Sequence, residues 1–360
     1  MNNRKLSLLN FLNSKKKLQF HYANPTDNTL RKDAESAVIT VFEYDDNTVN
    51  QYQLAAVSEC AALTNTPKKI WINIDGLKHD DVKNICSMFQ IDPLIEEDIL
   101  SVGQRSKYDV FDHFTYCLMY MLSYDKQSQI LSKEQISLVL GKNFVLTFQD
   151  EADKDAFTKV RQRLQNKATR MQAYGTDFLY YSLVDAIVDD YFIAMDSFAD
   201  KIENNENEIL ENKYRIGLPT ILLRKEMMVM RHVIYATRDV VKGLTKNDNN
   251  LFEKNTERYL KDVYDHIFQA TEIVENYREG MANLQDLYMN QENLKMNESM
   301  KVMAIVTCLL APASVIGGTF GMNFVHIPFT QDKYGFYFAV AAMLLIPVWM
   351  IYVFKKRGWF

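Results

Sequence analysis

The sequence predicts an α+β cytoplasmic domain, with a mixed or antiparallel sheet and flanking helices, followed by a long stalk helix and two C-terminal transmembrane helices. Three observations carry this prediction. Residues 37–149 combine β-branched apolar runs with short amphipathic segments, and strand signals disappear after residue 151. Two uncharged runs, 302–320 and 335–354, lie near the end of the chain. Each run is long enough to cross a hydrocarbon core as a helix.

The first part of the chain contains the strand candidates. Apolar runs rich in β-branched and aromatic residues predict strands at 37–42, 69–74, 114–123, 135–140 and 144–148. Apolar residues at helical spacing predict helices at 80–89 and 93–100, the second of which starts at a proline. Gly141-Lys142-Asn143 is typical of a turn between the last two strands.

Helical patterns follow without interruption by strands. A helix is expected over 152–167, then an acidic helix over 176–212 and a basic-leaning helix over 220–244, separated by Gly217-Leu218-Pro219. Opposite charges on two helices joined by a turn predict an antiparallel hairpin. The charge at the acidic end is also explained by an ordinary solvated face; its carboxylates are Asp196, Asp200, Glu203, Glu206, Glu208 and Glu211.

The region after residue 250 predicts one very long helix, because no proline occurs before Pro312. Some 70 residues at 1.5 Å each give a length on the order of 100 Å. A helix of that length cannot be buried in one globule, so we expect a stalk of parallel copies that continues into the first span. The expected divisions are a tail (1–36), an α/β domain (37–167), the hairpin (168–249), the stalk (250–301), the first span (302–323), an external loop (324–334), the second span (335–354) and a basic C-terminus (355–360).

A stripe of small and polar residues runs along the first span. Steps of three or four residues place its members on one helix face: Asn297, Met300, Ala304, Thr307, Ala311, Ser314, Gly318 and Gly321. Close packing against another helix is the ordinary explanation of small residues in a membrane helix. The alternative is a pore lined by one stripe from each of several copies, with neutral oxygens from Asn297, Thr307, Ser314 and Asn323. The stripe alone leaves both open.

Composition excludes several classes of function. The net charge of −5 provides no basic field for nucleic acid. No GxxxxGK[ST] loop is present, so we expect no nucleotide as a partner, and no catalytic constellation stands out, so we expect no enzyme. The four cysteines form no CxxC pair, which leaves structural zinc unsupported.

Charges flanking the two spans predict the orientation of the chain. Lys295 and Lys301 precede the first span, and Lys355-Lys356-Arg357 follow the second, whereas the connecting loop offers only Lys333. The positive-inside rule then places both termini in the cytoplasm. The N-terminal segment has no signal-peptide pattern, so we expect an inner (plasma) membrane of a bacterium or archaeon.

The position of Gly321-Met322-Asn323 is more specific than its composition. It lies at the outer end of the penultimate span, before a short loop, a final span and a basic C-terminus. This arrangement, together with 297–302, 318–324 and 355–359, resembles the CorA family of magnesium channels over roughly residues 37–360. The resemblance implies a funnel-shaped homopentamer in a lipid bilayer that takes up Mg²⁺ passively, driven by the membrane potential.

The resemblance also implies regulatory and gating residues. Divalent ions between adjacent cytoplasmic domains would hold the channel closed at Asp98 and Asp262, assisted by Glu97 and Asp265. From the residues alone, Glu96-Glu97-Asp98 is only an acidic helix turn. The apolar gate would involve Met300 and Met303, with Leu310 as a further candidate, and Met322 and Asn323 would form the outer filter. Ala311 stands where the family often has methionine. The acidic hairpin end would face a basic ring of Lys355, Lys356 and Arg357.

Two alternatives remain open on sequence grounds. The same scaffold could transport cobalt, nickel or zinc, although the family resemblance implies that Met322 in the motif favours magnesium. A different class of protein, a membrane-anchored cytoplasmic sensor or scaffold without transport, would also have two spans. An anchor has no need of a polar stripe, so the function of Asn323 separates the two.

Overall fold

The computed structural model describes residues 31–64, 66–124, 130–150, 157–166, 171–211, 218–246, 251–323, 327–329 and 332–358. The chain forms two compact units. The first extends to Asn207 and resumes from Ile216 to Ala282, and the second includes the chain from Asn283 onward. Most of the predicted N-terminal tail and much of the predicted external loop lie outside the described residues.

A mixed sheet forms the centre of the first unit. Its seven strands in the described chain have the order β2-β1-β3-β7-β6-β5-β4. β3 and β7 pair in parallel, and the other neighbouring strands pair antiparallel, which confirms the predicted mixed sheet. The strands are β1 (Val38–Tyr44), β2 (Val49–Leu54), β3 (Lys69–Asp75), β4 (Lys107–Val110), β5 (Phe114–Tyr124), β6 (Leu131–Gly141) and β7 (Phe144–Gln149).

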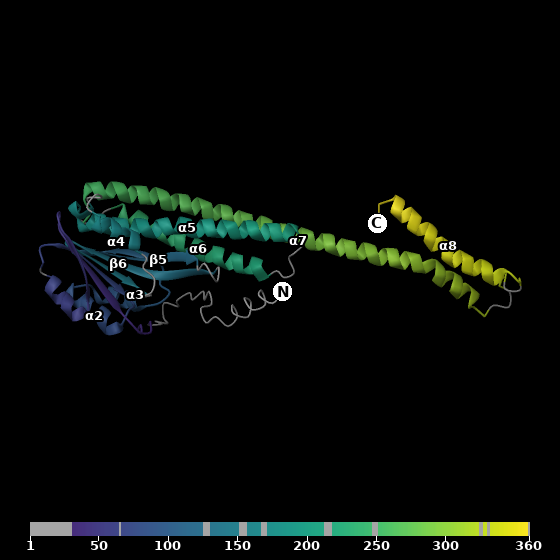
Figure 1. The fold of residues 1–360 in the computed structure, drawn as a ribbon, viewed down its shortest axis with the longest axis horizontal. Coiled ribbons are helices and arrows are strands. Elements are labelled where there is room, and N and C mark those ends of the chain that lie inside the picture. The colour runs from purple at the N-terminus through teal and green to yellow at the C-terminus, as the bar shows by residue number, and fades with distance from the viewer. Residues whose placement is uncertain are drawn as a thin grey trace. The chain divides into compact units, whose positions relative to one another are not determined.

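Helices cover both faces of this sheet. Figure 1 shows α2 and α3 on one side, and α5, α6 and the first part of α7 on the other. The helical segments of this unit are η1 (Val57–Leu63), α2 (His79–Met88), α3 (Pro93–Leu100), α4 (Thr158–Gln165), η3 (Met171–Ala173), α5 (Thr176–Leu210), α6 (Leu218–Leu244) and the start of α7 (Lys254–Phe320). In the core, Trp71 stacks on Phe42 at 4.9 Å between ring centroids and donates Nε1–H to Thr147 Oγ1.

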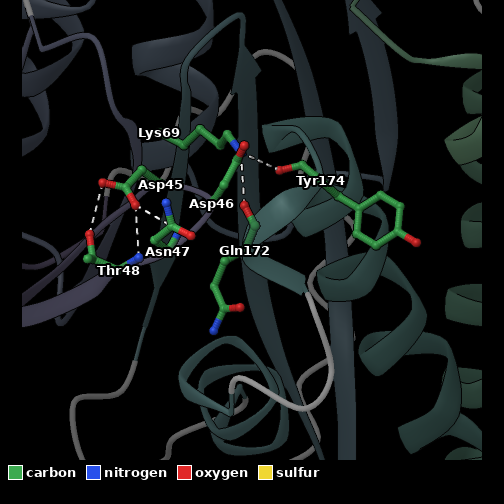
Figure 2. Close-up of polar contacts among 7 residues, drawn as sticks. All are labelled: Asp45, Asp46, Asn47, Thr48, Lys69, Gln172 and Tyr174. Atoms are coloured by element: carbon green, nitrogen blue, oxygen red, sulfur yellow. Dashed lines mark hydrogen bonds and ion pairs between the residues drawn. The ribbon is translucent and has the colours of Figure 1, made fainter.

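The segment before α5 is fixed to the sheet by a lysine (Figure 2). Lys69 Nζ donates to the carbonyl oxygens of Gln172 and Tyr174 at 2.9 and 3.0 Å, and also contacts Asp46 Oδ1. Asp45 orders the neighbouring β1–β2 turn by accepting from the backbone of Asn47 and Thr48. These contacts hold the segment before α5 against one end of the sheet.

The two helices after the sheet pack antiparallel. Tyr191 OH on α5 lies 2.9 Å from Thr237 Oγ1 on α6, and Lys201 Nζ lies 2.7 Å from Glu226 Oε2. This ion pair has its lysine on the acidic helix and its glutamate on the basic helix, the reverse of the arrangement expected from the sequence. α6 begins at Leu218. The following proline thus lies in the first turn, where a missing N–H costs no helical hydrogen bond.

Two helices in the described chain are long and apolar enough to cross a membrane. They are the 67-residue α7, which runs from the first unit into the second, and α8 (Gly335–Lys356). α7 ends at Phe320, just before the Gly-Met-Asn motif that the predicted first span included. The mixed sheet, the long helix and the two apolar helices confirm the predicted fold class, whereas the funnel-shaped assembly stays a prediction.

Candidate functional site

The second half of α7 is helical up to the motif. Backbone bonds close the last turn, from Gly321 N to the Gly317 carbonyl at 3.0 Å and from Met322 N to the Thr319 carbonyl at 3.4 Å. Pro312 lies inside the helix without ending it. In a membrane segment, neighbouring groups can satisfy the carbonyl that a proline leaves without a donor. The motif is therefore presented at the end of a continuous helix.

One face of this segment packs within its own chain. Ile305 is buried, and Leu309 and Ile316 are partly buried. A Cβ placed on Gly317 would lie 3.6 Å from the terminal methyl of Met343, so α8 also runs close to α7 at this position, about 100° around the helix from Ile316. Apolar residues from two helices meet here, as expected for adjacent membrane helices.

The predicted stripe lies on the opposite side of α7. Residues advance by about 100° around a helix, which puts Ala304, Ala311 and Gly318 roughly opposite the packed Ile305, Leu309 and Ile316. All of the predicted pore and filter residues are exposed in the single chain: Asn297, Met300, Met303, Ala304, Thr307, Ala311, Ser314, Gly318, Gly321, Met322 and Asn323. The stripe is thus not buried inside one copy, and its role in a pore stays a prediction.

The hydroxyl of Thr307 illustrates what the stripe can offer. Thr307 Oγ1 donates to the Met303 carbonyl at 2.9 Å, one turn earlier in the same helix. Its proton is used within the helix, so its oxygen presents lone pairs outward. An exposed acceptor oxygen suits the water shell of a hard cation.

Asp98 lies near the end of α3, which is capped by Asp92 through a 2.9 Å bond from Leu94 N and begins with Pro93. The Asp98 side chain is 12% exposed and forms an ion pair with Lys107 on β4. Burial raises the pKa of Asp98 above its ordinary value, and Lys107 opposes that rise. Asp98 therefore already has a cationic partner, which a divalent ion would have to displace.

Asp262 lies on α7 in the first unit, and its side chain is 65% exposed. His266 Nε2 lies 4.0 Å from Asp262 Oδ2, one turn along the helix. The structure also brings Asp185 and Asp189 of α5 to His266, with ligand atoms of all three within 4.8 Å of one another. Carboxylates and an imidazole at this separation can share a divalent ion.

The pKa of Asp185 reflects the burial of this cluster and the closeness of its two carboxylates. Burial raises the pKa of Asp185, and the neighbouring Asp189 raises it further, while His266 acts in the opposite direction. A cation placed among these groups would relieve the repulsion between the two carboxylates. The predicted helpers Glu97 and Asp265 are both exposed. Among the described residues no contact joins Asp98 to Asp262 within the chain, and the prediction assigns them to different copies.

The end of α8 carries the predicted basic residues. Lys355 and Lys356 occupy its last turn, where cations interact favourably with the helix dipole, and Arg357 is the C-cap residue. All three are exposed.

Comparison with known proteins places this geometry in a family. The model of the protein family described as "CorA-like Mg2+ transporter protein" matches residues 68–356 of this chain. The chain belongs to the CorA-like Mg²⁺ transporter family. Every candidate residue except Arg357 lies within the matched range. The CorA resemblance expected from the sequence is thereby confirmed.

Individual relatives match most of the chain. The cobalt/magnesium transport protein CorA of Thermotoga maritima is 35% identical over 327 residues, covering 90% of this chain and 93% of that protein. A putative metal ion transporter of Bacillus subtilis is 28% identical and covers 81% of this chain and 89% of its own length. The solved CorA magnesium transporter of Methanocaldococcus jannaschii superimposes with a TM-score of 0.72 at 21% identity, over 90% of this chain and 99% of that one.

Sequence reasoning missed three residues near the predicted ligand Asp262. Asp185, Asp189 and His266 become neighbours only through the packing of α5 on α7. A signal was present, because two aspartates four residues apart interrupt the apolar first half of α5. The lysine paired with Asp98 had no such signal.

Proposed function

We propose that this chain is the subunit of a divalent cation channel that takes up Mg²⁺ passively. The observation that carries the proposal is the exposed row of small residues and neutral oxygens on α7, opposite the face that packs within the chain. Membership of the CorA-like family supports the same reading. A helix face that is polar, free of charge and unburied in one copy suits an aqueous path shared by several copies.

The driving force is the membrane potential. A doubly charged ion moving inward gains about 4.6 kcal/mol per 100 mV of inside-negative potential, twice the value for a single charge. No nucleotide hydrolysis is needed for uptake on this scale. For uptake driven in this way, the protein spans the inner (plasma) membrane with both termini in the cytoplasm.

The outer filter is formed by Gly321, Met322 and Asn323. Mg²⁺ sheds its water reluctantly, so a side-chain carbonyl that accepts from bound water costs less than direct coordination. Further inward, Met300 and Met303 form an apolar gate, with Leu310 next to them. Ala311 leaves the middle of the path wider than a methionine there would.

Closure follows from ions at the cytoplasmic carboxylates. Asp98 and Glu97 of one copy face Asp262 and Asp265 of the next, and high internal Mg²⁺ neutralises their mutual repulsion. The cluster of Asp185, Asp189 and His266 extends this site beyond Asp262. An imidazole among carboxylates also suits cobalt or nickel, which makes these ions the strongest alternative cargo and regulators.

The assembly is a homopentamer with a funnel-shaped outline, embedded in the bilayer through α8 and the end of α7. In it the basic residues Lys355, Lys356 and Arg357 form a ring toward the acidic ends of the helical hairpins. A long helix with an unburied stripe favours such an assembly, because each copy offers its stripe to a common axis.

Replacing Asn323 by alanine tests the channel against a membrane anchor. In proteoliposomes under an imposed potential, Asn323→Ala should abolish Mg²⁺ uptake while leaving expression and oligomer size unchanged. Val306→Ala, which changes an exposed apolar side of α7 outside the stripe, is the matched control and should transport normally. Full uptake by Asn323→Ala would reject the pore assignment. Parallel assays with cobalt, nickel and zinc identify the preferred ion.

A further inference from the structure

The helical hairpin of the first unit has two exposed faces of opposite charge. The acidic face lies on α5 and consists of Ile193, Asp196, Asp200 and Glu203, all exposed and spaced by three or four residues. The basic face lies on α6 and consists of Arg224, Lys225 and Met228, also exposed. Each face combines charge with a large apolar side chain, Ile193 at 56% and Met228 at 46% exposure.

No ion pair among the described residues compensates these charges. Among the described residues, neither Arg224 nor Lys225 has an ion-pair partner, and the same is true of Asp196, Asp200 and Glu203. The sequence suggested that the two helices attract each other through these charges. Instead the ion pair between the two helices is formed by Lys201 and Glu226. At about 100° per residue, the acidic and basic faces lie on the sides of α5 and α6 that face away from this pair.

The two faces lie at the same height along the hairpin. The contacts Lys201–Glu226 and Tyr191–Thr237 fix the antiparallel register of α5 and α6. In that register, Glu203 is level with Arg224, and Asp200 lies between the levels of Lys225 and Met228. Their lack of pairing within one chain therefore comes from their direction, not from their height.

α7 runs alongside both helices in this unit. Tyr277 OH on α7 donates to the Met195 carbonyl of α5, and Arg231 of α6 donates to Glu275 of α7. A rotation about an axis along α7 preserves the height of every residue. If several copies surround such an axis, the acidic face of one copy and the basic face of the next lie at the same position along the axis.

We propose that the acidic face of α5 in one copy docks against the basic face of α6 in the neighbouring copy. This inference rests on the proposed function only in taking the assembly to be cyclic about α7. Such a contact joins two different surfaces head to tail, and a closed ring uses both on every copy. Ile193 and Met228 supply the apolar area, and the charges determine which surfaces meet.

A second copy fits these faces better than other occupants do. An anionic membrane surface would repel the acidic face, and a soluble acidic partner would leave that face uncovered. Beyond the basic face, burial lowers the pKa of His232, and the nearby Lys133 and Arg105 lower it further. The complementary negative charge is present in the same chain.

Cross-linking between two differently tagged subunits tests the contact. The background is Cys308→Ala, because the other three cysteines are buried. Subunits with Asp200→Cys are co-expressed with subunits carrying Lys225→Cys, and the purified complex is treated with a short bismaleimide. Any product joining the two tags is then intermolecular. Asp80→Cys, an exposed position on α2, replaces Asp200→Cys in the matched control.

The proposal predicts a strong product for the Asp200–Lys225 pair and little for the control. A second arm uses Glu203→Cys and Arg224→Cys as the thiol pair. In this background, Asp200→Lys alone should reduce the amount of cross-linked product several-fold. Combining Asp200→Lys with Lys225→Asp should restore the product. An oligomer that gives no product, or whose product ignores charge reversal, overturns this interface but leaves the channel. A protein that is monomeric by light scattering overturns both.

Discussion

The ion pair between Lys107 and Asp98 predicts an unusual effect on closure. Lys107 Nζ forms an ion pair with the Asp98 carboxylate, which is proposed to bind a regulatory divalent ion. The Asp98 side chain is only 12% exposed. The ion must therefore compete with an ammonium group already in place. Replacing Lys107 by methionine keeps the apolar stem and removes the competitor. Closure by Mg²⁺ should become more sensitive.

The magnitude follows from the energy of the displaced contact. A hydrogen bond to a charged group contributes about 1.5–3 kcal/mol, and 1.4 kcal/mol corresponds to a tenfold change in an equilibrium constant. Lys107→Met should thus lower the Mg²⁺ concentration for half-maximal closure by about 10- to 100-fold. Because burial raises the pKa of Asp98 and Lys107 opposes this, protons also compete more strongly in the variant. Its Mg²⁺ sensitivity should fall as the pH is lowered.

The assay is Mg²⁺ flux in proteoliposomes with the internal concentration varied. Lys83→Met, an exposed lysine on α2, is the matched control for loss of one positive charge and should leave closure unchanged. An unchanged or reduced sensitivity in Lys107→Met would refute the reasoning, since it would mean that Asp98 either binds no ion or needs the lysine to do so.

Two further predictions concern stability. In chelator-treated protein, Asp185→Asn should raise the melting temperature at neutral pH, because burial and Asp189 raise the pKa of Asp185 in the folded state. The folded state then holds this proton more tightly than the unfolded state, so the ionised group costs stability, and the advantage should vanish as the pH falls to the ordinary value for aspartate. Added Co²⁺ should stabilise the wild type more than the variant; equal stabilisation argues against ion binding there. Separately, Lys201→Met leaves the buried Glu226 without its cation and should cost about 3 kcal/mol in urea unfolding, most of it regained with Glu226→Leu. A loss below ~1 kcal/mol would contradict the importance of this pair.

The sequence predicted the parts of the fold whose apolar pattern is continuous. β3 and β5 and the long α7 each carry a long apolar run or an uninterrupted helical pattern. The edge strands β2 and β4 were missed, because one is largely polar and exposed and the other has only four residues. Both are fixed by pairing with a neighbouring strand and not by their own composition.

The candidate site also contains residues that could be predicted from the sequence and residues that could not. The stripe on α7 could be predicted because a helix places every third or fourth residue on one side, whatever the tertiary structure. Lys107 beside Asp98, and His266 beside Asp185, depend on packing between segments far apart in the chain. No spacing in a single sequence reports such contacts. The hairpin was expected for the wrong reason, since its buried ion pair is Lys201 with Glu226.

A structure of the assembled protein in lipid, determined by cryo-electron microscopy, tests the central claim most directly. The claim requires several copies of α7 around one aqueous axis, with Thr307, Ser314 and Asn323 of every copy facing it. Density for ordered water or a hydrated ion along that axis is the predicted result. Side chains of those three residues turned toward the acyl chains would contradict it, whatever the number of copies.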